Sequence, residues 1–135
     1  MRFESDLSCG LPESRTVYVV DDDSELRRSL QYLLEAMGIA VCPYSCGVQF
    51  LREVEHLEPS PIILDVRMPG TDGAQVLREL SRRLIKWPVV IFSASGEIED
   101  IELTLSLGAV AFLKKPARSS DLVKALNEAF ENLVH

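Results

Sequence analysis

Groups able to bind a cation or a phosphoryl group follow four short apolar runs in this chain. These groups are Asp21-Asp22-Asp23 after Val20, Asp65 after Leu64, Ser93 after Phe92, and Lys114-Lys115 after Leu113. Each apolar run is typical of a strand that is buried on both faces. Because the carboxyl ends of parallel strands meet at one edge of a sheet, and ligands bind at that edge, we expect the four groups to converge.

Three of the carboxylates form a candidate site for a divalent cation. Asp21, Asp22 and Asp65 would repel one another at a shared edge, and a hard cation would relieve this repulsion. Mg²⁺ prefers oxygen ligands and binds through one or two carboxylates, waters and phosphate oxygens. We interpret Asp23 differently, as the N-terminal cap of the following helix.

The other groups suit transfer of a phosphoryl group. A carboxylate such as Asp65 can act as a nucleophile and form an aspartyl phosphate. The ammonium of Lys115 would neutralise phosphoryl oxygens, and the hydroxyl of Ser93 would donate a hydrogen bond to them.

Strands and helices are expected to alternate around these groups. The apolar patterns predict strands at residues 16–20, 39–43, 62–65, 89–92 and 111–114, and helices that begin near residues 24, 46, 74, 97 and 120. In the first helix the predicted core residues are Leu26, Leu30, Leu33, Leu34 and Met37. Five strands alternating with five helices indicate an α/β fold with a parallel sheet covered on both faces.

Composition narrows the classes of function. The chain has 135 residues and a net charge of −7, which disfavours direct contact with nucleic acid because such contact depends on Lys and Arg. We expect a flexible tail at residues 1–14 and one domain at residues 15–135. The sequence contains no apolar stretch typical of a signal peptide or a membrane span.

The cysteines also bear on location. Cys9, Cys42 and Cys46 show no framework spacing, which favours reduced thiols and a cytoplasmic protein. A zinc site at Cys42, Cys46 and His56 is disfavoured, because residue 42 falls in a predicted strand and a fourth ligand is missing.

In combination, these motifs resemble the receiver domain of two-component response regulators, in particular the FixJ-like group within the LuxR/NarL-type branch. The matching pieces occur in family order over about residues 15–134, and they are Val-Val-Asp-Asp-Asp at 19–23, Asp-Val-Arg-Met-Pro-Gly at 65–70, Ser93-Ala94 and Lys115-Pro116. The resemblance implies a flavodoxin-like, doubly wound five-stranded sheet in the order 2-1-3-4-5.

The resemblance also implies a role for each residue of the site. Asp65 would accept a phosphoryl group from a sensor histidine kinase, with Mg²⁺ held directly by Asp22 and Asp65, by Asp21 through water, and by the backbone carbonyl of Arg67. Lys115 would pair with the phosphoryl oxygens, and a cis peptide bond is expected before Pro116. Ser93 and Phe112 would be the switch residues, although an aromatic residue in a strand is ordinarily part of the core.

These implications describe a signalling switch that assists its own phosphorylation and dephosphorylation, rather than a turnover enzyme. Its output would be control of transcription through an effector domain or a partner. The face formed by the helix at 97–107, the strand at 111–114 and the last helix would rearrange and support a homodimer. Neither nucleic acid nor membrane is expected to contact this domain.

Two alternatives from other classes remain open at this stage. One is a haloacid-dehalogenase-type phosphatase, with Asp21 as nucleophile and Asp23 as acid/base, although Ser24-Glu25 stands where Gly-Thr is expected. The other is a pseudo-receiver that only binds proteins.

Overall fold

A parallel sheet forms the centre of the molecule, whose computed structural model describes residues 15–68, 70 and 72–133. The five strands of this part are β1 (Arg15–Val20), β2 (Ile39–Tyr44), β3 (Ile62–Leu64), β4 (Val89–Ser93) and β5 (Ala111–Lys114). They lie in the order β2-β1-β3-β4-β5, and every neighbouring pair is parallel. The predicted α/β, flavodoxin-like fold is confirmed.

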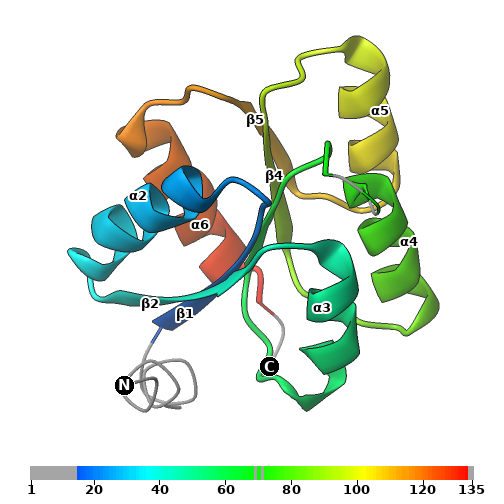
Figure 1. The fold of residues 1–135 in the computed structure, drawn as a ribbon, viewed down its shortest axis with the longest axis horizontal. Coiled ribbons are helices and arrows are strands. Elements are labelled where there is room, and N and C mark those ends of the chain that lie inside the picture. Colours follow the sequence, from blue (N-terminus) through cyan, green and yellow to red (C-terminus); the bar gives the residue numbers. More distant parts are fainter. Residues whose placement is uncertain (1–14, 69, 71, 134–135) are drawn as a thin grey trace.

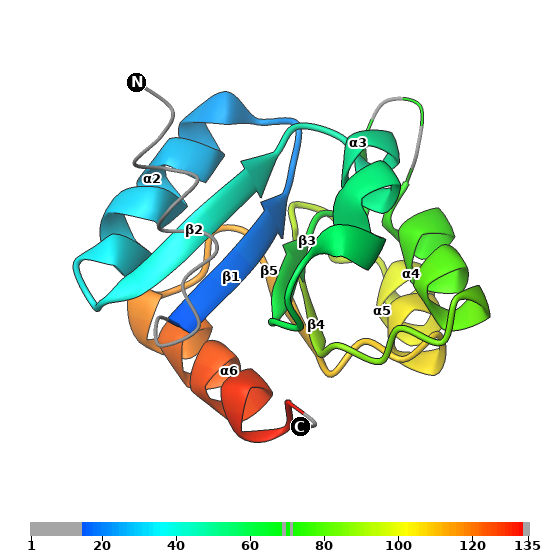
Figure 2. The ribbon, with the colours of Figure 1, turned by 90° about the horizontal axis from the view of Figure 1, so that it is seen from below.

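Helices cover both faces of the sheet. On one face lie α2 (Ser24–Glu35) and α6 (Ser119–Glu131), and on the other lie α3 (Gly47–Glu53), α4 (Gly73–Arg82) and α5 (Ile98–Ser106) (Figures 1 and 2). A short 3₁₀ helix, η1 (Val54–His56), continues α3. Strands β1, β3 and β4 therefore run through the interior, and their carboxyl ends open toward loops.

Side chains of the strands alternate between two apolar clusters. In β1, Tyr18 and Val20 belong to the cluster beneath α3 and α4, whereas Val17 and Val19 belong to the cluster beneath α2 and α6. This alternation follows from the period of two along a strand. Burial on both faces makes the register of β1 specific, because a slip of one residue would exchange the two sets.

Capping side chains place the starts of two helices beside the acidic edge. The Asp23 carboxylate accepts hydrogen bonds from the amides of Glu25 and Leu26, which confirms it as the cap of α2. Asp72 forms a reciprocal capping box with Gln75 at the start of α4. These caps satisfy amides that have no partner within the helix.

Some predicted boundaries and burials are wrong. Met37 is exposed, because α2 ends at Glu35 and residue 37 lies beyond the helical period. Strand β2 continues through Pro43 to Tyr44, which an edge strand tolerates because the missing amide faces away from its neighbour. The predicted tail at residues 1–14 lies outside the described residues.

The sequence also predicts reduced thiols and no membrane span. Cys46 is a free thiol, but Cys42 is disulfide-bonded, so the expectation of reduced thiols is wrong for Cys42. Cys42 does lie in β2, as predicted. Within the described part of the chain, none of the helices combines the length and the apolar character needed to cross a bilayer.

Trp87 offers a test of the strand direction. It precedes β4 and stacks on Tyr18 with ring centroids 5.9 Å apart, at the end of the sheet opposite the acidic groups. The rise of a strand separates Trp87 from Ser93 by about 20 Å. We expect Mg²⁺ to leave the tryptophan fluorescence almost unchanged in a titration. Strong quenching would contradict this placement of β4.

Candidate functional site

The acidic residues meet where the chain order of the strands reverses. Strand β1 lies between β2 and β3, and the backbone hydrogen bonds continue one residue beyond the strands. The amide of Asp21 donates to the Tyr44 carbonyl at 3.1 Å, and that of Asp65 donates to the Val20 carbonyl at 3.0 Å. The main chain therefore holds both aspartates at the switch point of the sheet, where ligands bind in open α/β folds.

Lys115 reaches this point from the end of β5. Its Nζ lies 2.8 Å from Asp21 Oδ2 and 3.5 Å from Asp65 Oδ2. Lys115 is held in turn by its amide, which donates to the Ser93 carbonyl at 2.8 Å. The predicted cis peptide bond between Lys115 and Pro116 is present.

The two carboxylates that Lys115 contacts are almost fully removed from solvent. The side chain of Asp21 is 3% exposed and that of Asp65 is 8% exposed, against 19% for Lys115. Burial raises the pKa of Asp21 more than the hydrogen bond from Lys115 and the amide of Asp23 lower it, and the charge of Asp65 raises it further. The ionised form of Asp21 is therefore less stable in this site than it is in water.

Asp22 completes a set of oxygen donors. One carboxylate oxygen from each of Asp21, Asp22 and Asp65 lies within 4.8 Å of the others, and Asp22 is exposed to solvent. A donor set made only of carboxylates, with one exposed member, fits a hard cation that keeps several waters. The predicted ligands are thus brought together.

The loop after β3 presents Asp65 through close backbone contacts. The amide of Arg67 donates to Asp65 Oδ1 at 3.3 Å, and the amide of Gly73 donates to the Val66 carbonyl at 2.8 Å. A Cβ at residue 73 would lie 2.7 Å from the carbonyl oxygen of Asp65. Glycine is required here because α4 begins against the backbone of the loop.

The predicted switch residues lie on β4 and β5. Ser93 is fully buried, and its Oγ accepts a hydrogen bond from the Ser95 amide at 3.2 Å. Phe112 is partly buried and packs against the cluster beneath α3 and α4. Their movement, and the use of the Arg67 carbonyl as a metal ligand, stay predictions.

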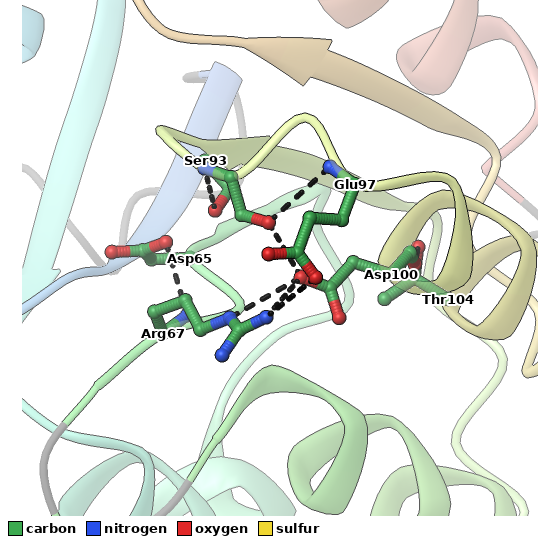
Figure 3. Close-up of polar contacts among 7 residues, drawn as sticks. Asp65, Arg67, Ser93, Glu97, Asp100 and Thr104 are labelled. Carbon is green, nitrogen blue, oxygen red and sulfur yellow. Dashed lines mark hydrogen bonds and ion pairs between the residues drawn. The ribbon is translucent and has the colours of Figure 1, made fainter.

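Contacts that the sequence pattern did not suggest surround the site. Arg27 Nη1 donates to the backbone carbonyl of Asp21 at 2.6 Å. The guanidinium of Arg67 binds Asp100 (Figure 3). Asp100 also accepts a hydrogen bond from Ser95. Residues 67 and 100 are too distant in sequence for any spacing rule to join them.

Known proteins with a similar sequence identify the family of this chain. A family model described as the response regulator receiver domain matches residues 17–127. This chain belongs to that family. The receiver is 36% identical over 116 residues to the transcriptional regulatory protein FixJ of Azorhizobium caulinodans, covering 86% of this chain and 55% of that protein. It is also 36% identical to the transcriptional regulatory protein TdiR of Thauera aromatica, covering 84% of this chain and 50% of TdiR.

Solved structures agree with this assignment. A crystal structure of FixJ-N has a TM-score of 0.85 and 29% identity to the receiver, covering 91% of this chain and 98% of FixJ-N. The receiver spans about half the length of the curated relatives that it matches. The predicted FixJ-like resemblance is confirmed.

The phosphatase alternative is not favoured by the geometry or by the family match. Asp23 caps α2 and is therefore engaged with backbone amides rather than with a reacting group. Asp21 is almost completely buried, with one oxygen on Lys115 and the other on the amide of Asp23.

Removing the buried negative charge should stabilise the metal-free receiver. The folded-state pKa of Asp21 lies above its ordinary value of 3.8, so the fold favours the protonated carboxyl over the ionised one. The stability that this preference contributes is fully present below pH 3.8 and is lost as the pH rises through the folded-state pKa. We expect Asp21→Asn to raise the melting temperature in chelator, with a gain that grows toward neutral pH. Melting curves at several pH values check this, and a gain confined to acidic pH would contradict it.

Mg²⁺ should stabilise the receiver through the same carboxylates. Binding only to the folded state at about 100 times Kd adds about 2.7 kcal/mol. We expect Asp22→Asn to remove most of this gain in thermal melting, whereas Asp121→Asn, which removes an exposed charge on α6, should keep it. A parent melting curve that does not respond to Mg²⁺ would exclude this role.

Proposed function

We propose that this receiver is a phosphorylation-activated switch in which Asp65 accepts a phosphoryl group from a sensor histidine kinase. The observation that carries the proposal is the position of Lys115 Nζ, within ion-pair distance of Asp21 and Asp65, with Asp22 beside them. Buried opposite charges at a switch point suit a group that must gain and lose phosphate.

Asp65 is the better nucleophile of the two buried aspartates. Asp21 has both oxygens in short contacts, at 2.9 Å from the Asp23 amide and 2.8 Å from Lys115 Nζ. The corresponding contacts of Asp65 are longer, at 3.3 Å from the Arg67 amide and 3.5 Å from Lys115 Nζ. Weaker hydrogen bonds leave more electron density on the attacking oxygen.

The transfer would exchange one bond for another. A bond forms between phosphorus and a carboxylate oxygen of Asp65 as the phosphorus–nitrogen bond of a phosphohistidine breaks, and the electron pair stays on the histidine nitrogen. Catalysis of such a step depends on positioning and charge rather than on further covalent chemistry. Lys115 would move from the carboxylate to the phosphoryl oxygens, to which Ser93 would also donate.

The carboxylates would also hold Mg²⁺. Asp22 and Asp65 would bind it directly, Asp21 through water, and Arg67 through its carbonyl. When bound, Mg²⁺ supplies positive charge opposite the phosphoryl oxygens. The carboxylates of Asp21, Asp22 and Asp65 stay close together in the metal-free protein because Lys115 offsets part of their mutual repulsion.

The switch would be read on the face formed by α5, β5 and α6. Ser93 would turn toward the phosphoryl group, and Phe112 would rotate inward into the space that it leaves. Helix α5 of this face already exposes apolar side chains, with Ile98 at 69% and Leu105 at 44% exposure, which suits a homodimer.

The wider role follows from the relatives. FixJ and TdiR are named transcriptional regulators, so we propose control of transcription from the cytoplasm. The net charge of −7 supports an output through an effector domain or a partner rather than through DNA contact by the receiver. We also propose that it is a switch rather than a turnover enzyme.

Treatment with a small phosphodonor and Mg²⁺ tests the phosphoacceptor. We expect one phosphoryl group per chain by intact-mass measurement, mapping to Asp65, and none on Asp65→Asn. Asp65→Asn lacks the carboxylate oxygen that would form the bond to phosphorus.

Asp23→Asn is the matched control for this labelling. Asn also caps helices well, so α2 should form and labelling should persist. Under the phosphatase alternative the same change would remove the acid/base. A label on Asp21, or equal labelling of Asp65→Asn, would refute the proposal, and a mass measurement in solution reports whether phosphorylation produces a dimer.

A further inference from the structure

An arginine joins the loop that carries Asp65 to the start of α5. Arg67 Nε and Nη2 lie 3.2 and 2.8 Å from Asp100 Oδ2, and Nη2 lies 3.6 Å from Glu97 Oε2 (Figure 3). Two of the three guanidinium nitrogens, Nε and Nη2, donate to the same oxygen of Asp100, which limits the orientation of Arg67. The contact therefore joins the loop after β3 to the first turn of α5.

Asp100 connects this arginine to the residues around Ser93. Its side chain is 16% exposed, and its Oδ2 also accepts from Ser95 Oγ at 2.6 Å. Hydrogen bonds from Ser95 and then from Arg67 lower the pKa of Asp100, so it stays ionised near neutral pH. Ser95 donates its own amide to Ser93 Oγ. We call Arg67, Ser95 and Asp100 the α5 latch.

Helix α5 has little else to hold its N-terminal turn. Within α5, all of which the structure describes, Thr104 alone is buried, whereas α4 buries five residues. The N-cap residue Glu97 makes no side-chain capping bond, and Ile98 is exposed. An element with few buried apolar groups opens at low free energy, so polar contacts at its end determine its position.

We propose that the α5 latch fastens the N-terminal turn of α5 to the Asp65 loop and that phosphorylation of Asp65 releases it. This inference rests on the proposed function of Asp65. It assigns the side chains of Arg67 and Asp100 a regulatory role that is separate from metal binding.

Two backbone amides connect the latch to Asp65 and Ser93, the groups that phosphorylation would change. The Arg67 amide donates to Asp65 Oδ1, and the Ser95 amide donates to Ser93 Oγ. Phosphorylation replaces the single negative charge of the Asp65 carboxylate by about two on the phosphoryl group, and these compete with Asp100 for the guanidinium. A turn of Ser93 toward the new group withdraws the acceptor of Ser95. The phosphorylated state thus gains less from the latch than the free state, and that difference shifts the equilibrium.

Hydrogen exchange on the whole chain tests the latch. Asp100→Asn keeps the shape and an acceptor for Ser95 but removes the ion pair. Exposed pairs contribute little, so in metal-free protein we expect amides of the first turns of α5 to exchange about threefold faster than in the parent. With beryllofluoride and Mg²⁺ as the phosphoryl mimic, the difference should disappear, and Asp100→Asn should bind the mimic about threefold more tightly.

Two further variants make the test specific. Arg67→Gln should reproduce the exchange effect from the other side of the pair, and the double variant should add little to either. Glu79→Gln breaks ion pairs with Arg82 and Arg83 at the C-terminal end of α4 and should leave α5 unchanged.

The outcomes separate the latch from the function on which it rests. Equal exchange of parent and variants in metal-free protein, or a difference that persists with the mimic, overturns the latch while Asp65 keeps its role. A parent that fails to bind the mimic overturns both.

Discussion

Attraction between Lys115 and two buried carboxylates is the interaction on which the site depends. Burial makes each uncompensated charge costly, and Asp21 and Asp65 would repel one another without the ammonium. Burial raises the pKa of Asp21 more than Lys115 and the amide of Asp23 lower it, and repulsion from Asp65 raises it further. The residual repulsion favours whatever brings more positive charge to this edge of the sheet.

The parallel sheet makes this arrangement possible. Backbone hydrogen bonds beyond β1 and β3 hold Asp21 and Asp65 side by side, and the amide of Lys115 is bonded to the end of β4. Apolar clusters on both faces keep the strands in register, so the polar groups are held by elements that themselves require no metal. The packing supports a cluster of charges that would be unstable on a flexible loop.

Rigidity is unevenly distributed around the site. Strands β1, β3 and β4 are buried, whereas α5 offers only one buried residue and several exposed apolar ones. A change at Asp65 would therefore be transmitted more readily to α5 than to the sheet. Asp100 provides a direct route, because this residue of α5 accepts hydrogen bonds from both Arg67 and Ser95.

The sequence alone was sufficient for the alternating elements, the fold class and the convergence of Asp21, Asp22, Asp65, Ser93 and Lys115, because strand ends in a parallel sheet share one edge. It misplaced Met37 because helical periodicity does not show where a helix ends. Tertiary structure alone decided the pairing of Arg67 with Asp100, the need for glycine at residue 73 and the unequal engagement of Asp21 and Asp65. These depend on distances between segments far apart in the chain, which local patterns do not encode.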